Sequence, residues 1–470
     1  MKTRHNIYTG PVKPSLIAFL LLPLFYVAIG CEGFVEVDRP SGQLTTQAVF
    51  EDKTTATAAL LNIYAQLRDD GMLTGSNLSI TSNMAAYADD FNFYGIASNT
   101  TLNFYNNTLL ASNGQVASWW QSAYRQIYAA NAVIEGVLAS GSITTTDKGE
   151  LVAQAVFLRS LIHFNLANLY GDIPFAATTD YELNKDLGRT PVSQVYSFIV
   201  TDLLSAAQSL PEEYPAPDRT RPNRATVMAL LARVYLYQGA WQEAATAASY
   251  VIGNTQLYNL PTDLGSTFLN DSPSTIWQYS PALPGDNSAE GGAFIIATTP
   301  PDNLAMSSSL LDSFEPGDLR RQAWVGSITD GTTIWYYPFK YKQKYMTVAS
   351  VESSILFRLS EQYLIRAEAQ AHLGELTAAA TDLNTIRNNA GLPAISPVTE
   401  QQLLQAIVQE RRVELFGEGG HRFFDLKRTL LLDTVLGGLK PGWQSTDQVL
   451  PIPESELLLN PNLAPQNAGY

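Results

Sequence analysis

The chain has 470 residues, of which 46% are hydrophobic and 16% charged, and its formal net charge is −15. This length is sufficient for a large buried core and for more than one domain. The acidic balance argues against binding of nucleic acid through its phosphates, and the single cysteine, Cys31, excludes an intramolecular disulfide.

The amino terminus is organised like a secretory signal. Three basic residues precede an almost continuously apolar run over 16–29, and small residues lead into Cys31. The run is too short to span a membrane comfortably. A cysteine at this place is typical of a bacterial lipoprotein signal, so we predict a signal peptide over 1–30 and a lipid on Cys31. The alternative is an ordinary signal with a chance cysteine.

The next segments are a tether and a first helix. Residues 31–49 are acidic and then turn-rich, which suits a tether that leads into the fold. A helical stripe over 50–67 includes Leu60, Ile63 and Leu67. Residues 69–110 are dense in Gly, Asn, Thr and Ser with aromatic residues between them, which favours an ordered loop region that makes contacts.

Helical periodicity returns from residue 119 onward. A long helix over 151–170 is expected to stop at Gly171, and another is expected to start at Pro191 and to end near residue 210. We count four helical pairs, at roughly 117–170, 191–238, 224–252 and 359–387. The second and third overlap, so the register of the central part stays open.

Residues 224–252 predict two short helices joined by a glycine turn, in the manner of a tetratricopeptide-type repeat. Residues 363–387 align with 228–252 without a gap, so that Gly239 matches Gly374 and the alanine pair 244–245 matches 379–380. One such pair cannot bury its own apolar face, which predicts neighbouring pairs. Two unrelated alanine-rich hairpins are the alternative.

Residues 253–357 interrupt the helical pattern for about a hundred residues, and a long interruption of this kind favours a functional segment. We predict short strands over 275–279, 293–297 and 333–337. Aromatic rings can stack on sugar faces, although most such rings in proteins belong to a core. The candidate ligand contacts in this segment are Trp277, Tyr279, Trp324, Trp335 and Tyr336.

Residues 410–428 carry paired arginines and carboxylates around a tight turn over 417–420, which predicts a partly buried ion network. A catalytic role for His421 is conceivable, but a structural partner is the better interpretation. Asp286–Asn287 and Asp330–Gly331 resemble pieces of cation loops without a full ligand set. We therefore expect neither a metal nor a cofactor.

Several motifs together resemble the SusD/RagB outer-membrane lipoproteins. They are CEGFVEVDRP after the signal, FLRSLIHFNLANLYGDIPF, LLDSFEPGDLRR, RAEAQAHLGELTAAATDLNTIRNNAGL, ERRVELFGEGGHRFFDLKR and LPIPESELLLNPNLAPQNAGY. Their order and spacing agree with the family over nearly the whole chain. The signal departs slightly, because Ile29 stands where a smaller residue is common.

The resemblance implies a mainly α-helical fold of tetratricopeptide-like repeats with a loop-rich, partly β ligand-binding part. The expected parts are 50–252, 253–357 and 358–470. It also implies a lipid-anchored protein at the outer surface that caps a SusC-type TonB-dependent transporter and passes it an oligosaccharide, or a peptide in some members. No catalytic residues carry over. Ligand contacts are implied only as two regions, 277–345 and the loop 87–105, and the candidates in that loop are Asp89, Asn92, Phe93 and Tyr94.

Three functions remain to be distinguished. A capture protein would bind glycan without turnover and would lose affinity when Trp277, Trp324 or Trp335 is changed to Ala. A glycosidase would need two carboxylates that face one bond, whereas neighbours such as Asp89 and Asp90 tend to point apart. A pure interaction scaffold would use its repeats to bind a partner. The ligand itself is not named by the sequence.

Overall fold

The computed structural model describes residues 10, 49–396 and 399–470. The described residues from 49 onward fall in one compact unit. The predicted signal peptide and the tether with Cys31 lie outside the described residues, apart from Gly10 and Val49. In the described part of the chain, no helix is both long and apolar enough to cross a membrane.

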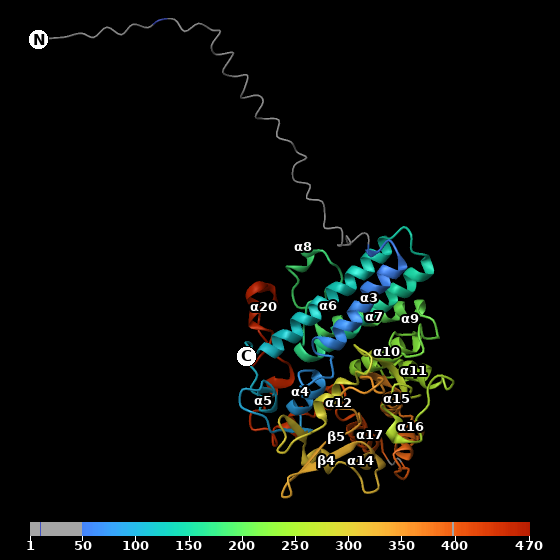
Figure 1. Cartoon of the computed structure of the whole chain (residues 1–470), viewed down its shortest axis with the longest axis vertical. Coiled ribbons are helices and arrows are strands. Elements are labelled where there is room, and N and C mark those ends of the chain that lie inside the picture. Colours follow the sequence, from blue (N-terminus) through green and yellow to red (C-terminus); the bar gives the residue numbers. More distant parts are fainter. Residues whose placement is uncertain (1–9, 11–48, 397–398) are drawn as a thin grey trace, which may run out of the picture. The chain divides into compact units, whose positions relative to one another are not determined.

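An array of helices, in which each helix packs mainly on its neighbours, makes up most of the unit (Figure 1). The array consists of α3 (Lys53–Asp69), α6 (Gly114–Ala139), α7 (Thr145–Tyr170), α9 (Val192–Ser209), α10 (Arg224–Gln238), α11 (Trp241–Ile252), α15 (Leu359–His372), α16 (Leu376–Asn389) and α17 (Glu400–Leu415). This confirms the mainly α fold, and α9 packs between α7 and α10, which settles the open register.

Helix α7 lies at the centre of the array. From Leu151 to Tyr170 nearly every residue is buried, and helices α3, α6 and α9 all contact it. Its buried residues include Arg159, His163 and Asn168, so the helix is surrounded by protein on its polar as well as its apolar sides. The chain leaves α7 at Gly171, whose φ of +76° favours glycine.

The two aligned hairpins both form. Gly239 and Gly374 end α10 and α15 with φ values of +70° and +79°, a left-handed conformation in which a side chain would be strained. The small Ala244 and Ala379 are fully buried where the helices approach each other. Helix α11 packs on α15, so the two hairpins stack directly although a hundred residues separate them in sequence.

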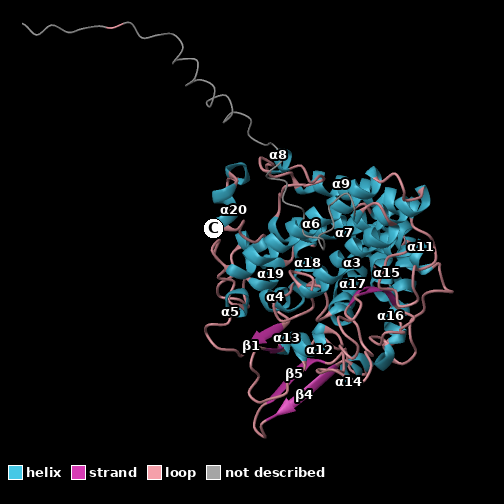
Figure 2. Cartoon of the chain, turned by 45° about the horizontal axis from the view of Figure 1, so that its top comes forward, coloured by secondary structure: helices cyan, strands magenta, loops and turns pink. Residues whose placement is uncertain are grey.

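Residues 253–357 form three two-stranded antiparallel sheets together with the partners that they recruit (Figure 2). The pairs are β1 (Phe91–Phe93) with β3 (Leu304–Met306), β2 (Thr275–Gln278) with β6 (Ile355–Arg358), and β4 (Val325–Thr329) with β5 (Ile334–Pro338). The strands predicted at 275–279 and 333–337 are therefore confirmed to within a residue.

The prediction of a strand at 293–297 is wrong. Residues Ala289–Phe294 form helix α12, whose amino end is capped by Ser288, because the Ser288 hydroxyl accepts a hydrogen bond from the Gly291 amide. Two further short helices lie in the same segment. They are α13 (Ser308–Leu311) and α14 (Leu319–Ala323).

The remaining helices border the array or lie beneath the loops. They are α4 (Ile80–Tyr87), α5 (Thr101–Tyr105), α8 (Tyr181–Asn184), α18 (His421–Arg428), α19 (Leu432–Leu436) and α20 (Glu454–Leu459). One large hydrophobic core runs through the array, and a second core under the loops gathers Phe91, Phe268 and Trp324. Each of these two cores contains several of the chain's aromatic residues.

Candidate functional site

The two regions expected to carry ligand contacts lie side by side. Strand β1 belongs to the loop region after α4, and β3 belongs to the long segment 253–357. Just beyond β1, the Tyr94 amide donates a hydrogen bond of 2.7 Å to the Asn303 carbonyl. Strand β3 in turn packs against β5, so residues from both regions reach one surface.

Tyr94 and Trp335 meet on that surface. Their ring centroids are 6.5 Å apart and their planes are perpendicular. Tyr94 is 41% exposed, while Trp335 is largely covered at 8%. Close by, the side-chain amide of Asn99 donates to that of Asn303 over 3.2 Å. We name Tyr94, Asn99, Asn303 and Trp335 the aromatic face. Rings beside amide groups suit a sugar, because its C–H faces can stack and its hydroxyls can hydrogen-bond.

Asn92 and Phe93 lie at the margin of the aromatic face. Asn92 is half-buried and pairs with Ala305 across the β1–β3 ladder. Phe93 is also half-buried, and its ring lies 6.3 Å from that of Tyr105 while packing on the second core. Both remain candidates for ligand contact at an edge.

Asp89 supports the fold instead of facing solvent. It is 6% exposed, and Arg412 and Arg422 bind its carboxylate at 2.8 and 2.7 Å. Burial by itself would raise the pKa of Asp89, but the two guanidinium groups lower it. Its backbone carbonyl also accepts from the hydroxyl of Ser307, next to β3. The structure thus revises the expected ligand contact to a buried ion cluster beneath β1 and β3.

Three of the predicted stacking rings lie in the cores. Trp277, Tyr279 and Trp324 are at most 3% exposed. The Trp277 indole donates to the Thr220 carbonyl at 3.0 Å, and the Trp324 indole donates to the Leu264 carbonyl at 2.9 Å. Their faces meet protein, as in any aromatic core. We therefore confine the proposed ligand contacts to the exposed and half-buried candidates.

Trp335 and Tyr336 lie on opposite faces of the β4–β5 hairpin, because successive residues of a strand alternate. Ile328 is opposite Trp335 in the ladder, and Ser327 is opposite Tyr336. Tyr336 packs on the second core and carries the guanidinium of Arg321 at 4.6 Å from its ring centre. The two rings cannot stack on one sugar unit together.

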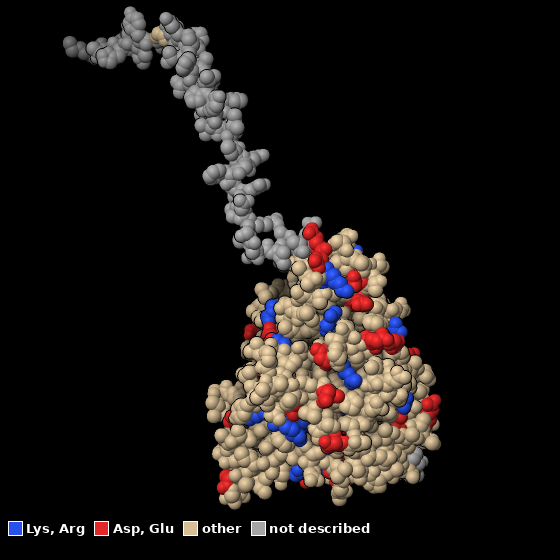
Figure 3. Space-filling view, turned by 45° about the vertical axis from the view of Figure 1, so that its right-hand side comes forward, with Lys and Arg blue, Asp and Glu red and all other residues tan. Residues whose placement is uncertain are grey.

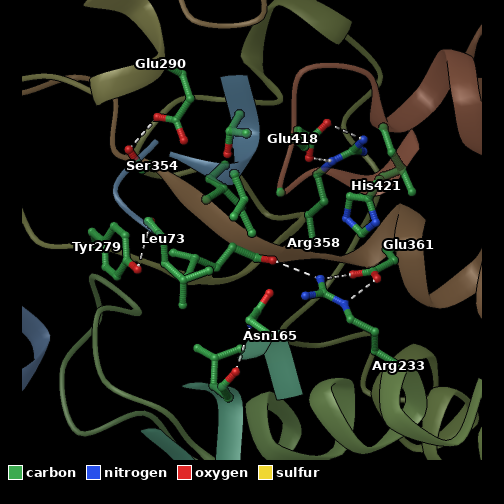
Figure 4. A pocket seen from close by; sticks show the side chains of 17 residues that line it. Leu73, Asn165, Arg233, Tyr279, Glu290, Ser354, Arg358, Glu361, Glu418 and His421 are labelled. Carbon is green, nitrogen blue, oxygen red and sulfur yellow. Dashed lines mark hydrogen bonds and ion pairs between the residues drawn. The ribbon is translucent and has the colours of Figure 1, made fainter. Parts of the chain in front are cut away.

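A small polar cavity lies inside the molecule where α7, α10, α15 and β6 meet (Figure 4). Arg233 binds Glu361 through two hydrogen bonds of 2.7 and 2.6 Å, and Arg358 binds Glu418 at 2.8 Å. The cavity measures about 50 Å³, which accommodates water but no sugar ring. These pairs hold the elements together.

Glu290 borders the same cavity. Its carboxylate accepts a hydrogen bond of 2.5 Å from Ser354, and no cation pairs with it among the described residues. Burial raises the pKa of Glu290 to about 7. A Cβ on Gly75 would collide with this carboxylate, so Gly75 allows the two backbones to approach.

The predicted ion network forms around the turn at 417–420. Glu414 lies between Arg320 and Arg358, and Glu418 binds Lys340. Burial lowers the pKa of His421 to about 4, so this imidazole is neutral at physiological pH. The nearby carboxylates are engaged by guanidinium groups, which supports a structural role for the whole group.

Neither predicted piece of a cation loop develops into a metal site. Asp286 accepts a hydrogen bond from the Leu283 amide, and Asp330 accepts from the amides of Thr332 and Thr333. In the part of the chain that the structure describes, no group of three or more His, Cys, Asp or Glu residues could hold a metal ion. Both aspartates stabilise turns.

The sequence alone did not single out Asn99, Asn303 or Arg321. The two asparagines belong to segments that only the β1–β3 pairing brings together. Arg321 follows Arg320 directly in the sequence. The two identical residues give no sign that Arg320 is fully buried while Arg321 is partly exposed.

Two sequence-family models match this chain. One, described as "Starch-binding associating with outer membrane", matches residues 34–236, and the other, the SusD family, matches residues 319–449. SusD-like protein P2 of Formosa agariphila is 27% identical over 98% of this chain and 100% of its own length. SusD-like protein P25 of the same organism is 24% identical over 95% of this chain and 98% of its own length.

Solved structures share the fold. A SusD superfamily protein from Bacteroides vulgatus has a TM-score of 0.76 at 21% identity and covers 90% of this chain and all of its own. A laminarin-binding SusD-like protein has the same TM-score at 24% identity, with the same coverage of both chains. The two matching models, the full-length relatives and the shared fold agree with the motifs quoted from the sequence. The chain belongs to the SusD/RagB family.

Proposed function

We propose that this protein captures an oligosaccharide on the aromatic face and passes it to a SusC-type TonB-dependent transporter in the outer membrane. Membership of the family implies association with that membrane. The observation that carries the proposal is the perpendicular contact of Tyr94 and Trp335 beside the amides of Asn99 and Asn303. The laminarin-binding relative supports a glycan as the ligand.

The aromatic face can bind a sugar without a chemical step. A pyranose ring offers apolar C–H groups to Tyr94, and its hydroxyls can reach the two asparagine amides, which both donate and accept. Binding of this kind is reversible and contains no nucleophile. We therefore propose a binding protein that does not cleave its ligand.

Glycan binding can be measured by affinity electrophoresis with laminarin and other soluble polysaccharides. We expect Tyr94→Ala to weaken the affinity by about tenfold or more, because an exposed ring contributes roughly 1–3 kcal/mol of stacking by analogy with other planar ligands. We expect Trp335→Ala to weaken it as well, because the largely covered Trp335 ring supports that of Tyr94. Tyr128→Ala is the matched control, since Tyr128 is 56% exposed on α6 and lines a different hollow, together with Gln66 and Glu456 and with no member of the aromatic face. Normal binding by both variants would contradict the assignment.

Turnover is tested separately. The protein is incubated with the polysaccharide that it retains, and the products are separated by size. We expect no shortening, because the adjacent carboxylates Asp89 and Asp90 are buried and bound by Arg412. Shorter products that also form with purified Asp89→Asn would point to an enzyme at another place.

The transporter partnership predicts that the protein co-purifies with a large outer-membrane β-barrel. The helical array offers a large surface away from the β4–β5 hairpin (Figure 1). If the array meets the transporter, Tyr94→Ala and Trp335→Ala leave the co-purification unchanged while they lose glycan. Loss of both together would show that the aromatic face itself contacts the transporter.

A further inference from the structure

Arg321 is the one basic side chain among the described residues that makes no hydrogen bond within the protein. Every other lysine and arginine in the described ranges 49–396 and 399–470 donates a hydrogen bond to a carboxylate, a side-chain amide or hydroxyl, or a backbone carbonyl. The guanidinium of Arg321 instead lies over the ring of Tyr336, 4.6 Å from its centre. Its N–H groups make no hydrogen bond within the described protein.

On the face shown in Figure 3, acidic and basic side chains lie scattered over an otherwise uncharged surface.

The acids around Arg321 are already bound by other arginines. Glu315 pairs with Arg387 at 2.5 Å, and Asp318 pairs with Arg320 at 2.8 Å. Both carboxylates line the same groove as Arg321. The positive charge of Arg321 is therefore the one that this groove leaves unmatched.

The groove is open and has room for a sugar unit. Its volume is about 530 Å³. Its walls come from the segment around Phe314 and from α14, where Gln322 lies beside Arg321. The Tyr336 ring restrains the Arg321 guanidinium by a cation–π contact and leaves its N–H groups available to a ligand. A fixed fork is the geometry that binds a carboxylate or a sulfate through two hydrogen bonds.

We propose that Arg321 and Tyr336 form a subsite for a negatively charged group on the glycan, either the carboxylate of a uronic acid or a sulfate ester. This inference rests on the proposed function, because it names the class of glycan. The subsite lies on the face of the β4–β5 hairpin opposite Trp335. A glycan chain that crosses the hairpin would meet an aromatic ring on one side and a cation on the other.

Because the net charge of the chain is −15, binding of an anionic glycan depends on a cationic side chain close to the ligand. A strongly acidic protein repels an anionic glycan at long range. Selectivity for such a glycan therefore requires a short-range contact with an unmatched cation. Arg321 can supply that contact, because among the described basic side chains it is the one that makes no hydrogen bond within the protein.

The test uses the full-length chain and two matched pairs of oligosaccharides. The first pair is oligogalacturonate and its methyl ester, and the second is a sulfated carrageenan oligosaccharide and its desulfated form. Titration calorimetry measures the affinity of the wild type, of Arg321→Gln and of the control Arg125→Gln. Arg125 is likewise an arginine on a helix surface, with 63% of its side chain exposed, but it pairs with Asp70.

We expect the wild type to prefer the charged member of one pair by about tenfold, the usual worth of a charge-assisted bidentate contact at a partly exposed site. Arg321→Gln removes this preference and leaves the affinity for the neutral member unchanged, while Arg125→Gln changes neither. The pair that shows the effect tells carboxylate from sulfate.

Three outcomes overturn the subsite. They are equal binding of both members of each pair by the wild type, an unchanged preference in Arg321→Gln, and a preference that Arg125→Gln removes as well. If the wild type binds the neutral members but shows no preference, only the subsite fails. If neither charged nor neutral glycans bind, and Tyr94→Ala behaves like the wild type, the proposed glycan capture fails with it.

Discussion

A ring in the core and a ring at the surface respond differently to truncation. Trp277 is fully buried and contacts Tyr64, Phe157 and Phe357. We expect Trp277→Ala to lower the free energy of unfolding by about 3–5 kcal/mol, because it leaves a large cavity. Tyr94→Ala, at an exposed position, should cost about 1 kcal/mol or less. Urea denaturation followed by circular dichroism at 222 nm measures both changes.

Comparing Trp277→Ala with Tyr94→Ala also distinguishes a loss of folding stability from a loss of glycan contact. If Trp277→Ala weakens glycan retention, the unfolding curve of the same preparation must be displaced. A variant that loses affinity with an unchanged curve would place Trp277 in direct contact with the ligand and contradict its burial.

Glu290 should make stability depend on pH. Its pKa is about 7 in the folded protein because burial disfavours the carboxylate, whereas an unfolded Glu titrates near 4.3. The folded state therefore binds more protons between these values. The contribution is fully present below about pH 4.3 and is lost as the pH rises through about 7, by roughly 4 kcal/mol in total.

The matched variant is Glu290→Gln, which keeps the shape and removes the titration. We expect it to be more stable than the wild type at pH 8 and to lose this advantage at pH 5, as measured by urea unfolding at both values. Glu213→Gln, at an exposed position, serves as the control. Parallel stability curves for the wild type and Glu290→Gln would show that Glu290 does not titrate in this range.

The turn after α17 depends on a buried ion network. Burial would raise the pKa of Glu414, but Arg358 and Arg320 lower it to about 2. Removing one member of such a network leaves the partner charges uncompensated. We expect Glu414→Gln to destabilise the protein by about 3–5 kcal/mol at pH 7. Glu400→Gln, which alters an exposed partner of His372, should stay within about 0.5 kcal/mol.

The penalty of Glu414→Gln should shrink in acid. The folded pKa lies below the unfolded value, so the stabilisation is present above about pH 4.3 and is lost as the pH falls towards 2. Unfolding measured at pH 7 and pH 3 tests this. An equal penalty at both values would assign the loss to packing instead of charge.

Helices were predictable because their signals are local. Asp52 and Asn223 cap α3 and α10 by accepting hydrogen bonds from amides of the first turn, and Gly239 ends α10. Periodicity and these end signals depend only on residues that are close together in the sequence, so they can be recognised without the fold. The short α12 was missed because six residues carry too little periodicity, and the apolar run over 293–297 favoured a strand.

The site was predictable by region but not by residue. Trp277 lies in a strand whose four residues are all buried, so the alternation that would separate an inner from an outer face is missing. Asp89 was expected at a ligand, yet its arginine partners follow more than three hundred residues later. Contacts over such distances depend on how elements pack, which a single sequence does not record.

At the scale of the whole molecule, the lipid on Cys31 is the proposed link to the membrane. We expect the wild type expressed in a Gram-negative host to incorporate a labelled fatty acid and to sediment with the outer membrane. Cys31→Ala should incorporate none, because the chain has no other cysteine. Mass spectrometry of the amino-terminal peptide measures the lipid directly, and an acylated Cys31→Ala chain would contradict the assignment.

The β4–β5 hairpin suggests how this architecture acquires new ligands. Within the described residues both strands form their ladder only with each other, and the hairpin is fastened to the rest by side chains. One short, continuous stretch of chain thus supplies Trp335 to one surface and Tyr336 to another. Replacing residues 325–338 by the corresponding hairpin of a relative leaves every other ladder intact. The proposed contacts of Trp335 and Tyr336 can therefore be exchanged together, while the helical framework and the positions of Tyr94 and Arg321 keep their own sequence.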